Sequence, residues 1–215
     1  MGRRGMAGSI AEERIRAKAE ALLRRRFPDA RIVHELVLEQ GGVRIDIAAI
    51  RPGFLAALEI KSERDTLKRL PEQIKAALKV CDLFGVCIAA KHEPEVGRWP
   101  GHKDGAEVVL GHAVDLLIEQ EDGFDCRHSA FCDGWRGNRG ETRLCNPADR
   151  LEMLWAEELK LISRAPKMSR QPAKHLICET MTGRQIREAV CAALRARPFP
   201  RADPAIPFPL LDLAA

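Results

Sequence analysis

The chain has 215 residues, of which 46% are hydrophobic and 31% are charged. This length accommodates one full domain and an additional segment. No apolar run approaches the roughly 18 residues needed to cross a bilayer, so the sequence argues against a membrane-spanning protein. The 35 Lys and Arg residues exceed the 31 Asp and Glu residues by four, an excess that permits a nucleic-acid partner without requiring one.

Seven cysteines, an odd number, do not form the pattern of an extracellular disulfide framework, and we expect reduced thiols. The first residues carry two arginines but lead into a charged helix, so no secretory signal is predicted. Together these features predict a cytoplasmic protein. Aromatic residues make up only 5% of the chain, which argues against recognition of unpaired bases by an aromatic platform.

The first half of the chain alternates helix-type and β-type patterns. Ser9 and Glu12 form a capping box at the start of an amphipathic segment, and Gly41-Gly42 marks a turn between two alternating segments. The predicted elements are a helix over 9–26, strands over 32–38, 43–50 and 55–61, a helix over 65–84, and a buried strand over 85–91.

The second half is less regular. Strand-like segments are predicted at 106–110 and 114–119, followed by a glycine-rich polar loop. One helix is predicted from Asn146-Pro147 to about Ile162 with Trp155 in the core, and two more over 173–181 and 182–198. The predicted organisation is a core over 1–119, a long loop over 120–145, a helical subdomain over 146–198 and a Pro-rich tail over 199–215.

The order helix, three antiparallel strands, helix, strand predicts an α/β fold with a mixed sheet, because the fourth strand returns through a helical crossover. If the turn at residues 51–54 closes symmetrically, facing residue numbers sum to 105. Asp46 then lies opposite Glu59, and Arg44 opposite Lys61. If facing numbers in the first hairpin sum to 81, Glu35 lies beside Asp46.

Carboxylates that face one another repel unless a cation neutralises them. Oxygen ligands without Cys or His favour Mg²⁺ or Mn²⁺, and a lysine two residues after Glu59, on the same face, could orient or deprotonate an attacking water. The simpler alternative is a solvated sheet face on which Glu59 and Lys61 form a surface salt bridge.

Asp46, the hairpin, the sequence Glu59-Ile60-Lys61 and the following helix with Gln73 resemble the PD-(D/E)xK nuclease superfamily. The segment LEIKSERDTLKRLPEQI is similar to a poorly characterised bacterial and phage-associated branch of it. The resemblance covers about residues 31–92. It departs from the superfamily pattern in having Ile45 in place of a proline, and from the RecB-like pattern in having Ala77 in place of an aromatic residue.

The resemblance implies a restriction-endonuclease-like αβββαβ core, to which this chain adds a C-terminal helical extension, and Mg²⁺- or Mn²⁺-dependent hydrolysis of DNA in repair, restriction or a phage-linked system. Asp46 and Glu59 would bind the metal, Lys61 would assist hydrolysis, and Glu35 and Gln73 would complete the catalytic set. Arg64, Lys68 and Arg69 follow the motif closely enough to contact DNA phosphates.

Other functions stay open at this level. The chain could be a non-catalytic DNA-binding or assembly module on the same fold, and a homodimer is a further alternative. A zinc site could organise the polar loop through Cys126, His128, Cys132 and Cys145, although these lack the usual CxxC spacing. The last two predicted helices could form a helix-turn-helix, but an ordinary helical hairpin is favoured.

Overall fold

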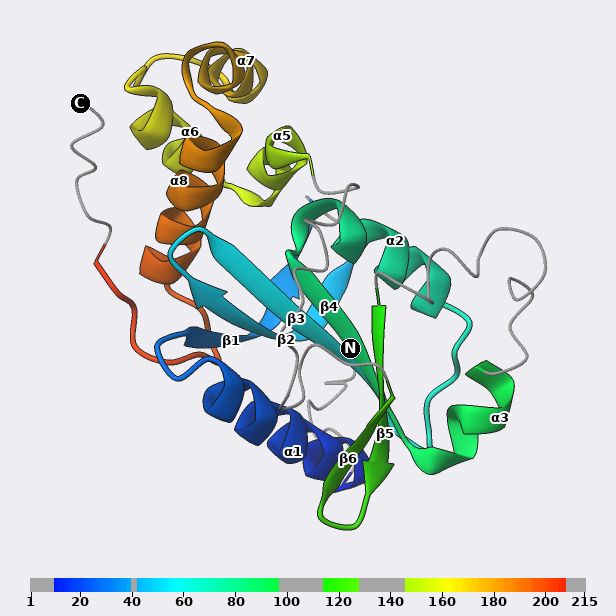
Figure 1. The fold of residues 1–215 in the computed structure, drawn as a ribbon. Coiled ribbons are helices and arrows are strands. Elements are labelled where there is room, and N and C mark those ends of the chain that lie inside the picture. Colours follow the sequence, from blue (N-terminus) through cyan, green and yellow to red (C-terminus); the bar gives the residue numbers. More distant parts are fainter. Residues whose placement is uncertain (1–9, 40–41, 97–113, 128–145, 208–215) are drawn as a thin grey trace, which may run out of the picture.

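The computed structural model describes residues 10–39, 42–96, 114–127 and 146–207, and a mixed β-sheet runs through its centre (Figure 1). The elements in chain order are α1 (Ile10–Arg26), β1 (Arg31–Val37), β2 (Arg44–Arg51), β3 (Phe54–Lys61), α2 (Leu70–Val80), β4 (Leu83–Ile88), η1 (Ala90–His92), α3 (Glu93–Val96), β5 (Val114–Gln120), β6 (Gly123–Arg127), α5 (Pro147–Arg150), η2 (Leu151–Met153), α6 (Ala156–Ser163), α7 (Arg170–Thr180) and α8 (Gly183–Ala196).

The six strands lie in the order β1-β2-β3-β4-β5-β6. The first three are antiparallel, β4 joins β3 in parallel, β5 joins β4 in parallel, and β6 closes the far edge antiparallel to β5. The predicted α/β class with a mixed sheet is therefore confirmed, and so is the helical crossover, because α2 connects β3 to the parallel strand β4.

Both predicted hairpin registers are confirmed. Pairs between β1 and β2 run from Arg31 with Ile50 to Val37 with Arg44, with residue numbers that sum to 81. Pairs between β2 and β3 run from Arg51 with Phe54 to Ile47 with Leu58, with numbers that sum to 105. The turn at the second hairpin places Gly53 at a φ of 65°, a left-handed conformation that favours glycine.

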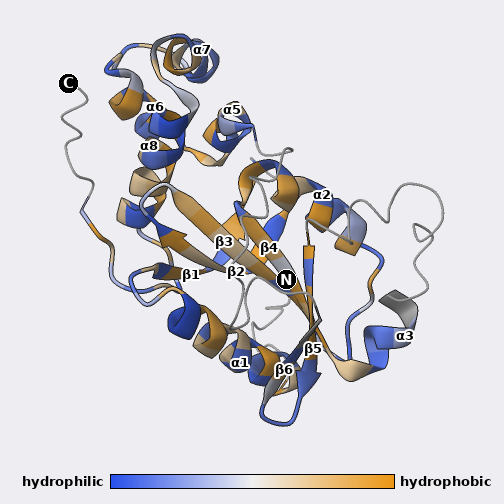
Figure 2. Ribbon diagram, in the orientation of Figure 1, coloured by the Kyte–Doolittle hydropathy of each residue, from blue (hydrophilic) through white to orange (hydrophobic). Residues whose placement is uncertain are grey.

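Helices cover both faces of the sheet. The apolar stripe of α1 packs on one face, in a cluster that includes Ile47 and Leu58. The opposite face carries α2 and the C-terminal helices in a larger continuous cluster, which joins Ile50 of β2 to Val190 of α8. Strands β3 and β4, buried on both sides, are among the most hydrophobic parts of the ribbon (Figure 2).

Helix α8 is a core helix. Most of its length from Ile186 to Leu194 is buried, and it packs against β2 and β3. A capping box begins it, since the Gln185 backbone N–H donates to Thr182 Oγ1 and the Gln185 side chain accepts from the Thr182 N–H. Because α8 packs into the core along most of its length, the structure favours the helical hairpin over a helix-turn-helix.

The C-terminal tail is extended along the edge of the sheet. Ala202 forms an isolated antiparallel bridge with Val33 of β1, and the His34 N–H donates to the Arg201 carbonyl. Arg31 donates to the carbonyls of Leu194, Arg195 and Arg197 at the end of α8. The tail and α8 are thereby fixed to β1.

The second helix begins later and ends earlier than predicted. Asp65 accepts hydrogen bonds from the N–H and hydroxyl of Ser62, so it closes a turn at 62–65 and does not cap a helix. The helix starts at Leu70, where Pro71 fits the first turn. At its other end, Asp82 accepts from the Leu55 N–H and leads the chain into β4.

The single helix predicted over 146–162 is wrong. Asn146 caps a first short helix as expected, but the backbone is extended at Leu154 and Trp155 before α6 begins. Glu158 accepts from the Trp155 N–H, and Arg170 donates to the Leu154 carbonyl, which holds the break open. Trp155 is 51% exposed, contrary to the core position predicted for it, and stacks against the Arg197 guanidinium.

The polar loop predicted over 120–145 begins later than expected, because residues 123–127 form β6. The predicted strand at 106–110 and the remainder of the loop, 128–145, lie outside the described residues. None of the helices in the described ranges is long and apolar enough to span a bilayer.

The junction between the C-terminal helices and the sheet depends on Arg150, which is fully buried and lies 2.6 Å from the Asp82 carboxylate. We predict that Arg150→Ala lowers the free energy of unfolding by about 3–5 kcal/mol, because it leaves a largely buried carboxylate without its counter-charge. Denaturant unfolding followed by circular dichroism measures the loss. Arg184→Ala, at an exposed ion pair with Glu188, should leave the midpoint unchanged, and equal losses in both variants would contradict this account.

Candidate active site

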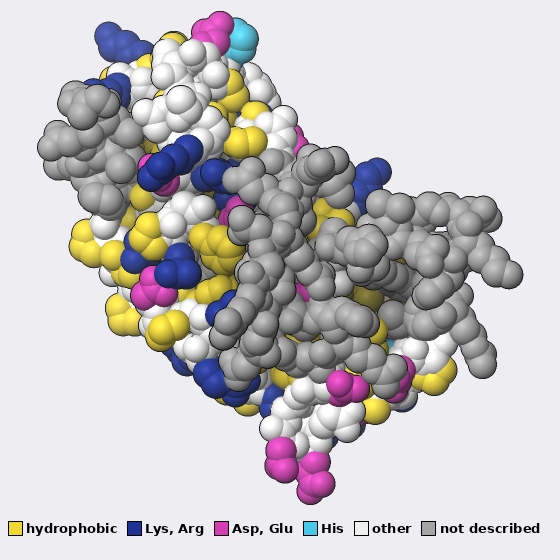
Figure 3. Space-filling view, viewed as in Figure 1, with side chains coloured by type: hydrophobic (Ala, Val, Ile, Leu, Met, Phe, Trp, Pro, Cys, Tyr) yellow, Lys and Arg dark blue, Asp and Glu magenta, His cyan; other side chains and the backbone are white. Residues whose placement is uncertain are grey.

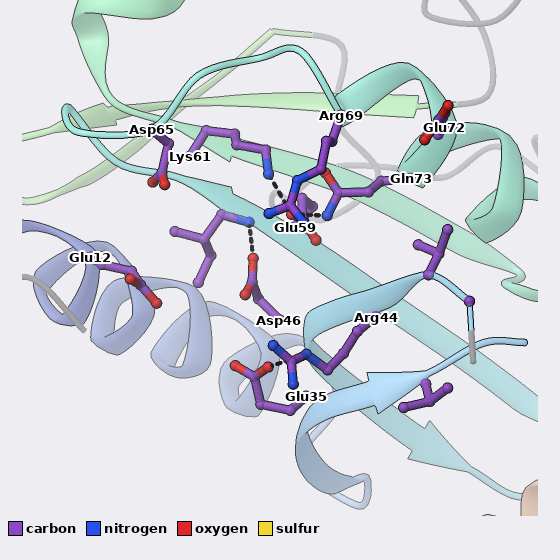
Figure 4. A pocket seen from close by; sticks show the side chains of 14 residues that line it. Glu12, Glu35, Arg44, Asp46, Glu59, Lys61, Asp65, Arg69, Glu72 and Gln73 are labelled. Carbon is purple, nitrogen blue, oxygen red and sulfur yellow. Dashed lines mark hydrogen bonds and ion pairs between the residues drawn. The ribbon is translucent and has the colours of Figure 1, made fainter. Parts of the chain in front are cut away.

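A pocket of about 810 Å³ opens between α1 and α2, at the end of β2 and β3 where these strands separate (Figure 4). It is lined by residues of α1, β1, β2, β3, α2 and the connecting segments. These are Glu12, Glu35, Val37, Gly42, Val43, Arg44, Asp46, Glu59, Ile60, Lys61, Asp65, Arg69, Glu72 and Gln73. All five predicted catalytic residues are among them.

Asp46 lies where the β2–β3 ladder stops. The last backbone pair is Ile47 with Leu58, so Asp46 and Glu59 are not paired as the extended register predicted. Instead, the Ile60 N–H donates to Asp46 Oδ2 at 2.7 Å. The Asp46 carboxylate thus replaces the backbone acceptor that Ile60 would have if the ladder continued. Both carboxylates nevertheless line the same pocket (Figure 4).

The neighbouring strand is also irregular here. Glu35 is one of two non-glycine residues with positive φ in the described chain, at 59°, and no backbone pair joins it to Asp46. Its carboxylate lies 2.6 Å from Arg44, so Arg44 does not face Lys61 as predicted. Irregular strand geometry at a pocket re-aims side chains and stores local strain, which often marks functional positions.

Glu59, Lys61 and Gln73 form a buried polar group. Glu59 is 2% exposed and Lys61 is 6% exposed, and the Lys61 Nζ donates to Glu59 Oε1 at 2.6 Å. The Gln73 side-chain amide, from α2, donates to the same oxygen. This burial removes the alternative of a surface salt bridge on a solvated sheet face.

Two acceptors in this group have no hydrogen-bond partner among the residues that the structure describes. Glu59 Oε2 and Gln73 Oε1 are both buried and unpaired. Burial and, to a smaller extent, the nearby Asp46 carboxylate raise the pKa of Glu59 to about 8, against the opposing effect of Lys61. Buried acceptors without donors have a high free-energy cost, which a bound cation would remove.

Arg16, which sequence reasoning did not select, is part of this site. Its side chain is 3% exposed, and its guanidinium contacts the carboxylates of Glu12, Glu35 and Asp46. The sequence carried a signal for it, since Arg16 lies three and seven residues before Ala19 and Leu23 and so falls on the apolar stripe of α1. A charged residue on a buried stripe needs partners in the fold.

The three cationic residues predicted to contact DNA are only partly brought together. Arg69 lines the pocket and projects toward its centre (Figure 4), and its guanidinium has no ion pair with the described residues. Arg64 and Lys68 are exposed and lie outside the pocket lining.

The structure offers no support for a zinc site within its described part. Cys126 belongs to β6, while His128, Cys132 and Cys145 lie outside the described residues. Across the described ranges, no group of three or more His, Cys, Asp and Glu side chains is arranged to hold a metal ion. A cation in the pocket would therefore use fewer protein carboxylates, together with other oxygen donors.

Comparison with known proteins gives one match. The family model described as bacteriophage P4 protein cII matches residues 7–99, slightly less than half of the chain. No curated protein and no solved structure gives a significant match. The matched residues contain every side chain that lines the pocket, and the match associates this part of the chain with phage proteins.

The raised pKa of Glu59 predicts how stability depends on pH. Between about pH 4.5 and 8 the folded chain keeps the Glu59 proton while the unfolded chain releases it, so stability falls as the pH rises through this window. The Glu59→Gln variant lacks the titrating group. Urea unfolding at pH 5, 6, 7 and 8 in the presence of a chelator should show a steeper decline for the wild type, and parallel curves would refute the burial effect.

Proposed function

We propose that this chain is a divalent-cation-dependent phosphodiesterase that acts on DNA, of the PD-(D/E)xK type. One observation carries the proposal: Asp46, Glu59 and Lys61, which match the motif in sequence, converge with Gln73 in one pocket where β2 and β3 separate. The element order from α1 to β4 supports a restriction-endonuclease-like core.

The residues present fit a hard divalent cation. Mg²⁺ is usually held by one or two carboxylates, with waters and substrate phosphates completing its shell. Asp46 and Glu59 would hold it, and the unpaired Glu59 Oε2 is a buried acceptor suited to that purpose. When bound, such an ion offsets phosphate charge and lowers the pKa of a water ligand.

The other side chains have roles consistent with phosphodiester hydrolysis. Lys61 is held by Glu59 in the pocket, so its ammonium group would be available to orient the attacking water or offset charge on a bound phosphate. Gln73 holds the same Glu59 oxygen from α2. Glu35 is placed as an auxiliary acid at the pocket edge, paired with Arg44.

DNA would be held mainly at the pocket rim. On the face drawn in Figure 3, Lys and Arg side chains of the described residues are mixed with acidic and apolar ones and form no single basic patch. Arg69 is the best-placed phosphate contact, with Arg64 and Lys68 nearby in the same segment. Contacts of this kind add affinity without reading sequence. The phage-associated family match favours a phage-linked DNA system.

The first test is cleavage. Wild-type protein should nick or degrade mixed DNA substrates with Mg²⁺ or Mn²⁺, and Asp46→Asn and Lys61→Ala should each lower the rate by about 100-fold or more. The surface variant Arg184→Ala is the control and should keep wild-type activity. Equal rates in all four proteins would refute the proposal.

The second test concerns the rim. Arg69→Ala should weaken DNA binding and reduce the salt dependence of log K by about one unit of slope, the loss expected for one phosphate contact. Binding is measured by fluorescence anisotropy at several salt concentrations, with Arg184→Ala as the matched control. A salt slope identical to that of the wild type would remove Arg69 from the interface.

A non-catalytic DNA-binding module is the second candidate, and one contact favours it. Both Asp46 carboxylate oxygens already accept hydrogen bonds, from Arg16 and from the Ile60 N–H. A pure binding module would bind DNA equally well with a chelator or with Ca²⁺, whereas the proposed enzyme binds more tightly with the cation. The dependence of DNA affinity on divalent cations thus separates the two functions.

A further inference from the structure

Arg16 binds three of the carboxylates that line the pocket, on the α1 side of Asp46. Its Nη2 donates to Glu12 Oε1 at 2.8 Å, Asp46 Oδ1 at 3.1 Å and Glu35 Oε1 at 3.5 Å, while Nη1 donates to the Asp46 carbonyl at 2.9 Å. One guanidinium thus joins carboxylates from α1, β1 and β2. On this side, the acidic groups already have a cation among them.

The other side of Asp46 differs. Glu59 has one oxygen bound by Lys61 and Gln73, while its Oε2 and the Gln73 Oε1 are buried and have no donor within the described ranges. Glu59 itself is 2% exposed. A bound cation would satisfy a buried carboxylate oxygen that has no donor. In the described part of the pocket, Glu59 Oε2 is such an oxygen.

The charges next to Arg16 are already partly compensated. Glu12, Glu35 and Asp46 share its guanidinium, and Glu35 also pairs with Arg44. A divalent ion among these groups would lie against the charge of Arg16 in a partly buried pocket, where repulsion is poorly screened.

We infer that the pocket takes a single divalent cation on the Glu59 side of Asp46, and that Arg16 is a built-in cation where a second ion would otherwise bind. This inference rests on the proposed function, because it concerns the ion that Asp46 and Glu59 would hold. Arg16 is a positioning residue, since it acts through the carboxylates and does not reach the Glu59 side.

Titration with Mn²⁺, followed by electron paramagnetic resonance of the free ion, tests the inference without any substrate. Wild-type protein and Arg16→Lys should each bind one ion, and Arg16→Met should bind two, because it removes the positive charge that three carboxylates share. Arg24→Met is the matched control: Arg24 also lies on α1 and bridges two carboxylates, Glu20 and Asp203, but outside the pocket. It should bind one ion.

A second pair of variants locates the ion and decides the matter if Arg16→Met does not fold by circular dichroism. Glu59→Gln should abolish Mn²⁺ binding, and Glu12→Gln should keep one bound ion. Loss of the ion in Glu12→Gln, two ions in the wild type, or no gain in folded Arg16→Met would overturn the inference and leave the proposed function standing. A wild type that binds no Mn²⁺ would refute both.

Discussion

The hydrogen bond from the Ile60 N–H to the Asp46 carboxylate is the interaction on which the pocket depends. Two antiparallel strands cannot separate inside a protein without leaving backbone donors unpaired, and each buried unpaired donor is costly. Here the Asp46 side chain supplies the acceptor for the Ile60 N–H, just beyond the last backbone pair between β2 and β3. The strands can then diverge, and the gap admits the Glu59–Lys61 pair from β3 and Gln73 from α2.

Buried arginines connect the parts of the molecule in several places. Arg31 joins β1 to the end of α8, Arg150 joins α5 to the β3–β4 connection, and Arg197 joins the end of α8 to Glu158 of α6. A guanidinium has five donors in a fixed plane, so one side chain can satisfy acceptors from several elements at once. Arg16 follows the same pattern, but its acceptors are carboxylates, so it also sets the charge of the pocket.

The antiparallel meander β1-β2-β3, the crossover to β4 and most of the candidate site could be predicted from sequence, because they depend on local rules, whereas the sequence pattern assigns β6 to the polar loop. Turns fixed the two hairpin registers, and these registers brought Glu35, Asp46, Glu59 and Lys61 to one end of the sheet. Local rules failed where long-range contacts decide the structure. The early end of α2 follows from Asp82, whose partners are Leu55 and Arg150.

Arg16 and Trp155 illustrate the same limit. Glu12 and Arg16 look like an ordinary surface pair at helical spacing, and only the folded chain brings Glu35 and Asp46 to them. Trp155 lies in an apolar pattern, yet Arg170 and Glu158 bind the carbonyl and the N–H of the peptide bond between Leu154 and Trp155, and the helix breaks there. The periodicity of the sequence identifies neither the partners of Arg16 nor the residues that break the helix before Trp155.

The bridge between Val33 and Ala202 has a consequence for the order of assembly on the ribosome. Strand β1 emerges early, but the segment that covers part of its outer edge is synthesised about 170 residues later, so that edge stays open during most of translation. Uncovered strand edges can pair with other chains. The nascent protein is therefore most vulnerable to intermolecular β-pairing until the last helix and the tail have docked.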